Sequence, residues 1–155
     1  MREEGITLVS LVITVIVLII LAGVGVYAGV QSIREASSDK LESELGMVQH
    51  AVFQQYYSYT VSKDEKCIVG EPVNISEINA IESEMGITMQ KGEEIESLPI
   101  AERYYRLTPT LLEGIGIEGS EDTYIVDYST GEVLNETVKK TITGVMLYKK
   151  GSTVK

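Results

Sequence analysis

The chain has 155 residues, with 13 Lys and Arg against 23 Asp and Glu, which gives a formal charge of −10. This acidic balance disfavours nucleic acid and anionic lipid as electrostatic partners. Cys67 is the one cysteine, so a disulfide within the chain is excluded, and a thiol without a role is the simplest interpretation. The length beyond the first 30 residues suits one domain rather than two.

An apolar segment, Ile6–Val30, lies near the N-terminus, and no charged residue lies between Glu4 and Arg34. As a helix with a rise of about 1.5 Å per residue it is roughly 37 Å long. That length crosses a hydrocarbon core of about 30 Å with some tilt. The hydroxyls of Ser10 and Thr14 can bond back to the preceding turn, so they are tolerated in lipid. The sequence therefore predicts membrane insertion.

Three interpretations of this segment stay open. A cleaved secretory signal has an apolar core of about 7–15 residues behind a basic start. Here the apolar run is longer and the start is MREE, although Ala28 before Gly29 offers a cleavage position. A plain signal anchor requires only the apolar run. The third interpretation uses the residues on both sides of Gly5.

The short polar leader ends in Gly5 and is followed at once by Ile6, Thr7 and Leu8. This arrangement resembles the leader of type IV pilins and type II secretion pseudopilins, and ITLVSLVITVIVLIILAGV resembles the first helix of clostridial and other Firmicutes pilin-like proteins. The resemblance implies that a prepilin peptidase cuts between Gly5 and Ile6 and methylates the new amine of Ile6. Thr7 and Leu8 match the usual continuation of the motif.

One position departs from the family pattern. The resemblance implies a glutamate at the fifth mature position, where its charge pairs with a neighbouring subunit's N-terminal ammonium and fixes the packing register. This chain has Ser10 there, which offers a hydrogen bond but no charge. A partner subunit or a different rule for the register is therefore expected. Small residues would let helices approach closely, at Ala22, Gly23, Gly25, Ala28 and Gly29.

The residues after the apolar segment predict that the helix continues. Between Gln31 and Val61 there is no proline, and Gly46 is the one glycine. Apolar residues recur at intervals of three and four, which predicts one buried helix face, formed by Leu41, Leu45, Val48, Val52, Tyr56 and Tyr59. Charged and amide residues, Glu44 and Gln49 among them, are expected on the solvent side. One helix over Ile6–Val61, without a linker, favours the pilin-like interpretation over a plain anchor.

Shorter elements follow. Asn74 and Glu77 form a predicted capping box, with Val73 and Ile78 as a hydrophobic staple, at the start of a helix that ends at Gly86. Its expected buried residues are Ile78, Ile81 and Met85. An extended segment is expected at Ile68–Pro72 and an exposed loop at Lys91–Glu94. A strand is expected at Tyr104–Leu107, a short helix at Pro109–Glu113, and a hairpin of Thr123–Tyr128 with Glu132–Thr137. A further strand is expected at Thr141–Lys149 and a frayed tail at Gly151–Lys155.

No set of residues predicts catalysis. His50 is the one histidine and is expected at the surface or in an interface, and the paired carboxylates of the loops are expected in solvent. A calcium site over Glu118–Asp127 stays open, because some pseudopilins bind this ion, although the segment lacks a dense alternation of ligands. We therefore expect no enzyme, no cofactor and no catalytic or metal-binding residue.

These observations predict an α+β fold in which a long N-terminal helix packs on a small antiparallel sheet, as in pilins. The expected organisation is a leader (residues 1–5), a transmembrane and assembly helix (6–30) and an extracytoplasmic head (31–155). The resemblance implies a filament subunit whose partners are other pilin-like subunits, prepilin peptidase, membrane lipid, and an assembly platform with its ATPase. A single-pass anchor whose head binds something at the cell surface is the alternative.

Overall fold

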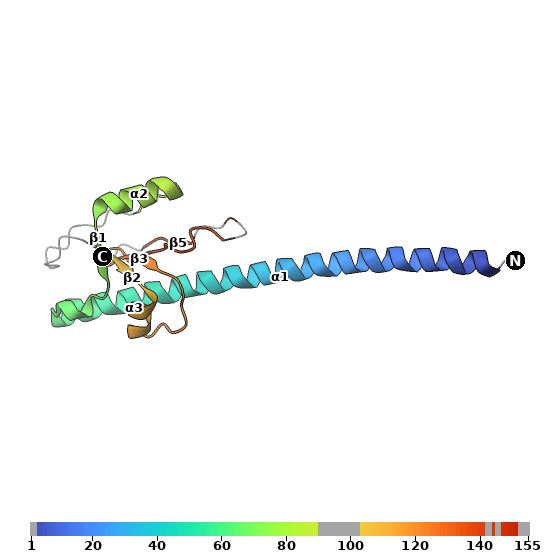
Figure 1. Cartoon of the computed structure of the whole chain (residues 1–155). Coiled ribbons are helices and arrows are strands. Elements are labelled where there is room, and N and C mark those ends of the chain that lie inside the picture. Colours follow the sequence, from blue (N-terminus) through green and yellow to red (C-terminus); the bar gives the residue numbers. More distant parts are fainter. Residues whose placement is uncertain (1–2, 90–102, 142–143, 145–146, 152–155) are drawn as a thin grey trace. The chain divides into compact units, whose positions relative to one another are not determined.

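A computed structural model describes residues 3–89, 103–141, 144 and 147–151, without the side chains of residues 3–7 and 24. The elements in chain order are α1 (Glu3–Ser62), the 3-10 helix η1 (Glu65–Cys67), β1 (Glu71–Val73), α2 (Ile75–Met85), β2 (Tyr104–Leu107), α3 (Pro109–Gly114), β3 (Tyr124–Asp127), β4 (Glu132–Asn135) and β5 (Tyr148–Lys149) (Figure 1). The predicted α+β fold, a long N-terminal helix packed with an antiparallel sheet, is confirmed. The chain divides into two compact units, Met1–Ser38 and Asp39–Lys155, which are described separately.

The first unit is the N-terminal part of α1. Its large apolar side chains are exposed, with Leu8 at 65%, Ile19 at 66% and Tyr27 at 74%. The hydroxyl of Thr14 donates to the carbonyl oxygen of Ser10 over 2.8 Å, which is the bond to the preceding turn that the sequence predicts. In the part of the chain that the structure describes, α1 is the one helix long and apolar enough to cross a membrane.

The second unit is organised around five antiparallel strands in the order β1-β2-β3-β4-β5. Strands β3 and β4 form the predicted hairpin, in which Ile125 lies opposite Leu134. Gly131 closes the turn with φ +69°, and its amide donates to the carbonyl of Asp127 over 2.7 Å. Glycine suits this left-handed conformation because it lacks a Cβ.

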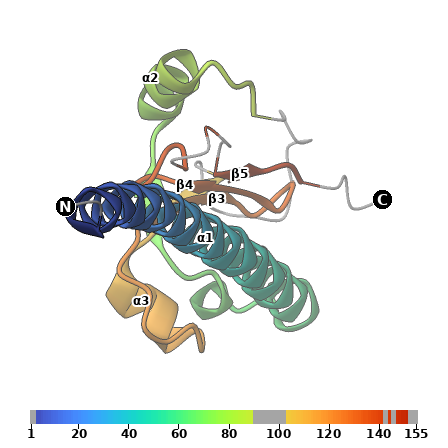
Figure 2. The same cartoon turned by 90° about the vertical axis from the view of Figure 1, so that its right-hand side faces the viewer.

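Alternation along the strands gives the sheet two buried faces. On one face, α1 contributes Leu45, Val48, Ala51 and Val52 to a core that also includes the following sheet and α3 residues: Tyr105, Leu107, Leu112, Tyr124, Val126 and Val133. On the other face, α2 contributes Ile78, Ile81 and Met85, and the sheet contributes Tyr104, Ile125 and Leu134. Figure 2 shows the sheet between α2 and the C-terminal part of α1.

Helix α2 begins and ends as predicted. The side-chain oxygen of Asn74 accepts hydrogen bonds from the backbone amides of Ser76 and Glu77, at 2.9 and 3.2 Å. Gly86 caps the C-terminal end with φ +65°. The carboxylate of Glu77, which a capping box would turn back to Asn74, accepts a hydrogen bond from Arg106 on β2. The N-cap is therefore confirmed, and Glu77 also links α2 to the sheet.

The prediction for the solvent side of the long helix is wrong at Glu44, which is 7% exposed. Leu41, expected in the buried face, is half-buried, while Ala51 is buried. The sequence pattern predicts that a charged residue outside the apolar face lies in solvent. Glu44 is buried instead because Ser120 and Tyr124, from distant segments, donate hydrogen bonds to its carboxylate.

The later boundaries also differ from the prediction. Strand β4 ends at Asn135 rather than Thr137, and between residues 141 and 149 the described strand is β5, Tyr148–Lys149. The predicted loop at Lys91–Glu94, residues 142–143 and 145–146 of the strand predicted over Thr141–Lys149, and the tail beyond Gly151 lie outside the described residues.

Candidate functional site

The residues predicted for processing lie at the start of α1. Gly5, Ile6 and Thr7 fall within the helix, but the side chains there lie outside the described residues, and Met1 and Arg2 lie outside them altogether. Cleavage after Gly5 and methylation of Ile6 therefore stay predictions.

The predicted assembly residues that the structure describes are all exposed: Leu8, Ser10, Ala22 and Gly23. A helix turns by about 100° per residue, so side chains three, four and seven positions apart share a face. By this rule Ala22, Gly25 and Gly29 share one face, whereas Gly23 lies about 100° from Ala22. A Cβ built on Gly25 or Gly29 would meet nothing within 4 Å. This face leaves room for the backbone of another helix.

The C-terminal part of α1 differs sharply from the rest of the acidic chain. From Leu45 to Ser62 there is no Asp, Glu, Lys or Arg. Before Asp39 the charged residues are few, namely Arg2, Glu3, Glu4, Arg34 and Glu35, so the second unit carries nearly all of the net charge of −10. The outer side of α1 is thus an uncharged strip on an acidic unit.

We call the exposed side chains of this strip the uncharged face: Met47, His50, Gln54, Tyr57 and Val61. Their spacing of three, four, three and four residues places them on one side of the helix. The apolar members are exposed to a large degree, with Met47 at 52%, Tyr57 at 58% and Val61 at 86%. Depletion of charge with aromatic and methionine side chains is the composition typical of the centre of a protein interface.

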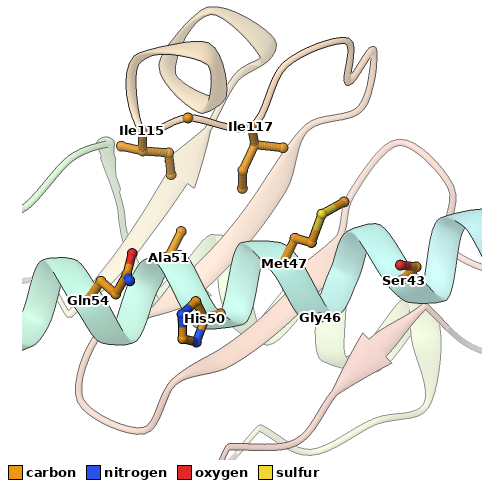
Figure 3. Close-up of a pocket in the computed structure, with 9 residues that line it drawn as sticks. Ser43, Gly46, Met47, His50, Ala51, Gln54, Ile115 and Ile117 are labelled. Carbon is orange, nitrogen blue, oxygen red and sulfur yellow. The ribbon is translucent and has the colours of Figure 1, made fainter.

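A hollow of about 430 Å³ adjoins the uncharged face. It is lined by α1 and by the segment after α3, through Ser43, Gly46, Met47, His50, Ala51, Gln54 and Ile115–Ile117. Figure 3 shows Ile115 and Ile117 pointing toward α1, with Met47 and Ala51 directed toward them. The hollow is open to solvent, and the four apolar side chains form its floor and wall.

A buried carboxylate fixes the segment that forms the far wall of the hollow. The hydroxyls of Ser120 and Tyr124 both donate to Oε1 of Glu44, over 2.9 Å for the Tyr124 bond. Burial, together with Glu44, raises the pKa of Tyr124 above its ordinary 10.0, so this phenol stays a donor at neutral pH. The amide of Ile117 donates to the carbonyl of Leu112 over 2.9 Å. The hollow is therefore a formed feature of the unit.

A second polar contact holds α1 against the sheet. The side-chain amide of Gln49 donates to the carbonyl oxygens of Gly131 and Lys150, at 2.7 and 3.2 Å. A Cβ on Gly46 would come within 3.3 Å of the Lys149 ammonium, so the end of this side chain lies against the helix at the glycine. Gln49, expected on the solvent side, instead links the helix to two distant turns.

The other sequence candidates do not converge. His50 is exposed on the uncharged face, as the surface placement predicts. Cys67 is half-buried, with its sulfur 3.5 Å from the hydroxyl oxygen of Ser62. In the loop considered for calcium, Asp122 accepts a hydrogen bond from Asn135 over 2.9 Å. Among the described residues, no group of three or more His, Cys, Asp or Glu is placed to hold a metal ion.

Two fully buried carboxylates on the α2 side of the sheet were not anticipated. Asp127 and Glu132 lie opposite each other across β3 and β4. Asp127 pairs with the Arg103 guanidinium at 2.7 Å, and Glu132 accepts a hydrogen bond from the Tyr148 hydroxyl. Each carboxylate therefore has its own donor, and these donors come from β5 and from the start of β2. The sequence predicted the strand that contains Asp127, and the partners in the fold explain the burial of this carboxylate.

Searches of protein-family models, curated proteins and solved structures found no match to this chain.

Proposed function

We propose that this chain is a structural subunit of a type IV pilus-like or type II secretion-like filament, held in the membrane and assembled through α1. The observation that supports it most is the exposure of the large apolar side chains that the structure describes between Leu8 and Val30, in a helix that continues to Ser62. Apolar helix surface of this extent requires lipid or other helices as its surroundings. A filament subunit uses both, first the bilayer and then the helices of its neighbours.

The face with Ala22, Gly25 and Gly29 is suited to the second stage. Lipid and leucine are equally apolar, so helices associate in a membrane through close packing rather than through the hydrophobic effect. Small side chains allow that packing. Identical subunits that join by heterologous contacts, one surface to a different surface, form an open helical filament.

Processing after Gly5 would prepare the helix for this role. The cut removes Arg2, Glu3 and Glu4, so the new N-terminal Ile6 begins the apolar segment with a single ammonium. The proposed partners are prepilin peptidase, which cuts and methylates, other pilin-like subunits, and the platform and ATPase that extract subunits from the bilayer. The head, residues 31–155, would face the outside of the cell.

The test is the N-terminus of the mature protein. Mass spectrometry of the chain from producing cells should find Ile6 as the first residue, with or without a methyl group. Gly5→Ala should abolish this processing. Gly29→Ala is the matched control, because it makes the same change in an exposed part of the same helix where a Cβ meets nothing within 4 Å. An intact Met1 end on wild-type protein would refute the proposal, and a start at Gly29 would indicate a secreted head.

The single-pass surface protein is the second candidate, and Ser10 favours it. A chain without the family's buried charge lacks one device that fixes a subunit's register. Immunogold electron microscopy separates the two functions. Label along extended filaments supports the subunit, whereas label confined to the cell envelope in cells that do process Gly5 supports the anchor.

A further inference from the structure

We propose that the uncharged face and its hollow form the contact between successive copies of this chain, with Tyr57 and Val61 of one copy docking in the hollow of the next. This inference depends on the proposed filament function and names the surface through which the heads meet. Both halves of the contact are present on every copy, because the hollow lies near Met47–Gln54 and the two exposed side chains lie further along the same helix face.

Charge selects a second copy as the occupant. The second unit carries nearly the whole net charge of −10, so two heads repel wherever their acidic surfaces approach. Between Leu45 and Ser62, α1 has no Asp or Glu. The uncharged face therefore adds no carboxylate that would repel a second acidic copy. A basic partner would instead be expected at the carboxylate-rich surface, and it would gain nothing from an uncharged strip.

The apolar chemistry of the two halves matches. Val61 is 86% exposed and Tyr57 is 58% exposed, so both project from the unit. Met47, Ala51, Ile115 and Ile117 present apolar surface in a hollow of about 430 Å³. Moving these exposed side chains from water into an apolar site is favourable.

The offset between the two halves makes the contact open-ended. Tyr57 and Val61 follow Met47 by ten and fourteen positions, which at about 1.5 Å per residue places them roughly 15–21 Å further along the axis. Subunits that assemble through α1 point the same way, so docking one copy's side chains in the other's hollow uses two different surfaces. Such a heterologous contact leaves a free hollow at one end and free side chains at the other, and it continues from copy to copy.

Disulfide trapping in the full chain tests the contact. In a Cys67→Ser background, Met47→Cys and Val61→Cys are combined, and cells producing the protein are treated with a mild oxidant. The two positions are roughly 21 Å apart within one helix, and a disulfide needs Cα atoms closer than about 7 Å. Any crosslink is therefore between copies, and each copy carries both halves. We expect a ladder of multimers on non-reducing gels.

Two controls sharpen the outcome. Met47→Cys combined with Ser83→Cys, an exposed position on α2, should give no ladder. Gln54→Glu adds one charge to the uncharged face with almost no change of shape, and it should reduce the ladder at least fivefold. Asn79→Asp adds the same charge at an exposed position of α2, and it should leave the ladder unchanged. Equal reduction by both variants would overturn the assigned surface.

The proposed filament function is tested separately, by measuring cleavage after Gly5 and looking for filaments in the same cells. Filaments without a ladder overturn this contact and leave the filament function standing. A ladder in cells that neither cut at Gly5 nor make filaments supports the contact and refutes the filament. Dimers from Met47→Cys alone would show a symmetric face-to-face contact, which contradicts the offset docking.

Discussion

Removal of the Glu44 carboxylate tests the least expected feature of the head. Glu44→Ala deletes the acceptor that the hydroxyls of Ser120 and Tyr124 share. Tyr124 is fully buried and Ser120 is 8% exposed, so water replaces the lost acceptor poorly. The variant should destabilise the head and loosen the segment that lines the hollow.

The expected loss follows from the groups left behind. A buried donor without an acceptor costs about 1–3 kcal/mol. The variant leaves two donors without their acceptor, the Ser120 hydroxyl and the Tyr124 phenol. The Ser120 oxygen still accepts from the amide of Asp122 at 3.3 Å, but that bond does not replace the acceptor of its own O–H. The gain in helix propensity from Glu to Ala is a few tenths of a kcal/mol and offsets little. We expect Glu44→Ala to lower the free energy of unfolding by about 2–4 kcal/mol.

The assay is urea unfolding of the full chain in detergent micelles, followed by near-UV circular dichroism of the tyrosines, since the chain has no tryptophan. Glu42→Ala is the matched control, because it removes the same group from an exposed position two residues earlier. Glu44→Gln keeps an acceptor without the charge, and it should lose about 1 kcal/mol. If Glu44→Ala and Glu42→Ala have equal effects, the carboxylate is solvated and the reasoning fails.

A double-mutant cycle with Tyr124→Phe isolates the shared bond. Tyr124→Phe removes the phenolic donor, so little remains for Glu44→Ala to remove at that bond. We expect a coupling free energy of about 1–2 kcal/mol, within the range of directly contacting pairs. Strictly additive losses would show that the two side chains do not interact.

Three further predictions concern the stability of the head. Gly131→Ala should destabilise it by at least about 2 kcal/mol, because φ is +69° and the new methyl would lie 2.3 Å from Cζ of Phe53; a denaturation midpoint equal to wild type would contradict this. Burial raises the pKa of Tyr104 from 10.0 to about 12, so the folded state binds this proton more tightly. The stabilisation is complete below pH 10 and lost between pH 10 and pH 12, which unfolding titrations against pH will show and which Tyr104→Phe should diminish. Arg103→Ala leaves the fully buried Asp127 without its guanidinium, and calorimetry should register a loss of about 3–5 kcal/mol.

Many helices, strands and caps of the head could be predicted because they depend on the spacing and type of residues that are close together in the sequence. The interval of three and four residues identified Leu45, Val48 and Val52 as core, and the pattern of Thr123–Tyr128 identified a strand, which the structure shows as β3. Asn74 and Gly86 are positions whose backbone geometry favours those residue types, so both caps were found. These features need no knowledge of what lies across the fold.

The features that the sequence did not predict depend on contacts between segments far apart in the chain. Glu44 and Gln49 look solvated by composition, and their partners lie about 80 residues further along the chain. The uncharged face was visible in the sequence as a gap in charge, but its significance required knowing which helix side the sheet leaves open. The hollow depends on Ile115 and Ile117, which follow the predicted short helix and belong to no predicted helix or strand.

Ser10 gives the sharpest test of how the apolar helix is used, because a carboxylate near the membrane end of a helix is tolerated only with a partner. Ser10→Glu introduces the carboxylate that type IV pilins carry at the corresponding position, at an exposed site one turn before Thr14. Val12→Glu places the same charge about 200° round the helix, roughly 3 Å further along. An unpaired charged side chain in lipid costs about 2.5–3.5 kcal/mol at the centre of a helix and less toward its end. If the Ser10 side of the helix meets a neighbouring subunit's N-terminal ammonium, Ser10→Glu should assemble at least as well as wild type and Val12→Glu should fail. Counting filaments by electron microscopy in both variants decides it. Equal failure would place Ser10 against lipid and would leave the subunits to be aligned by their heads.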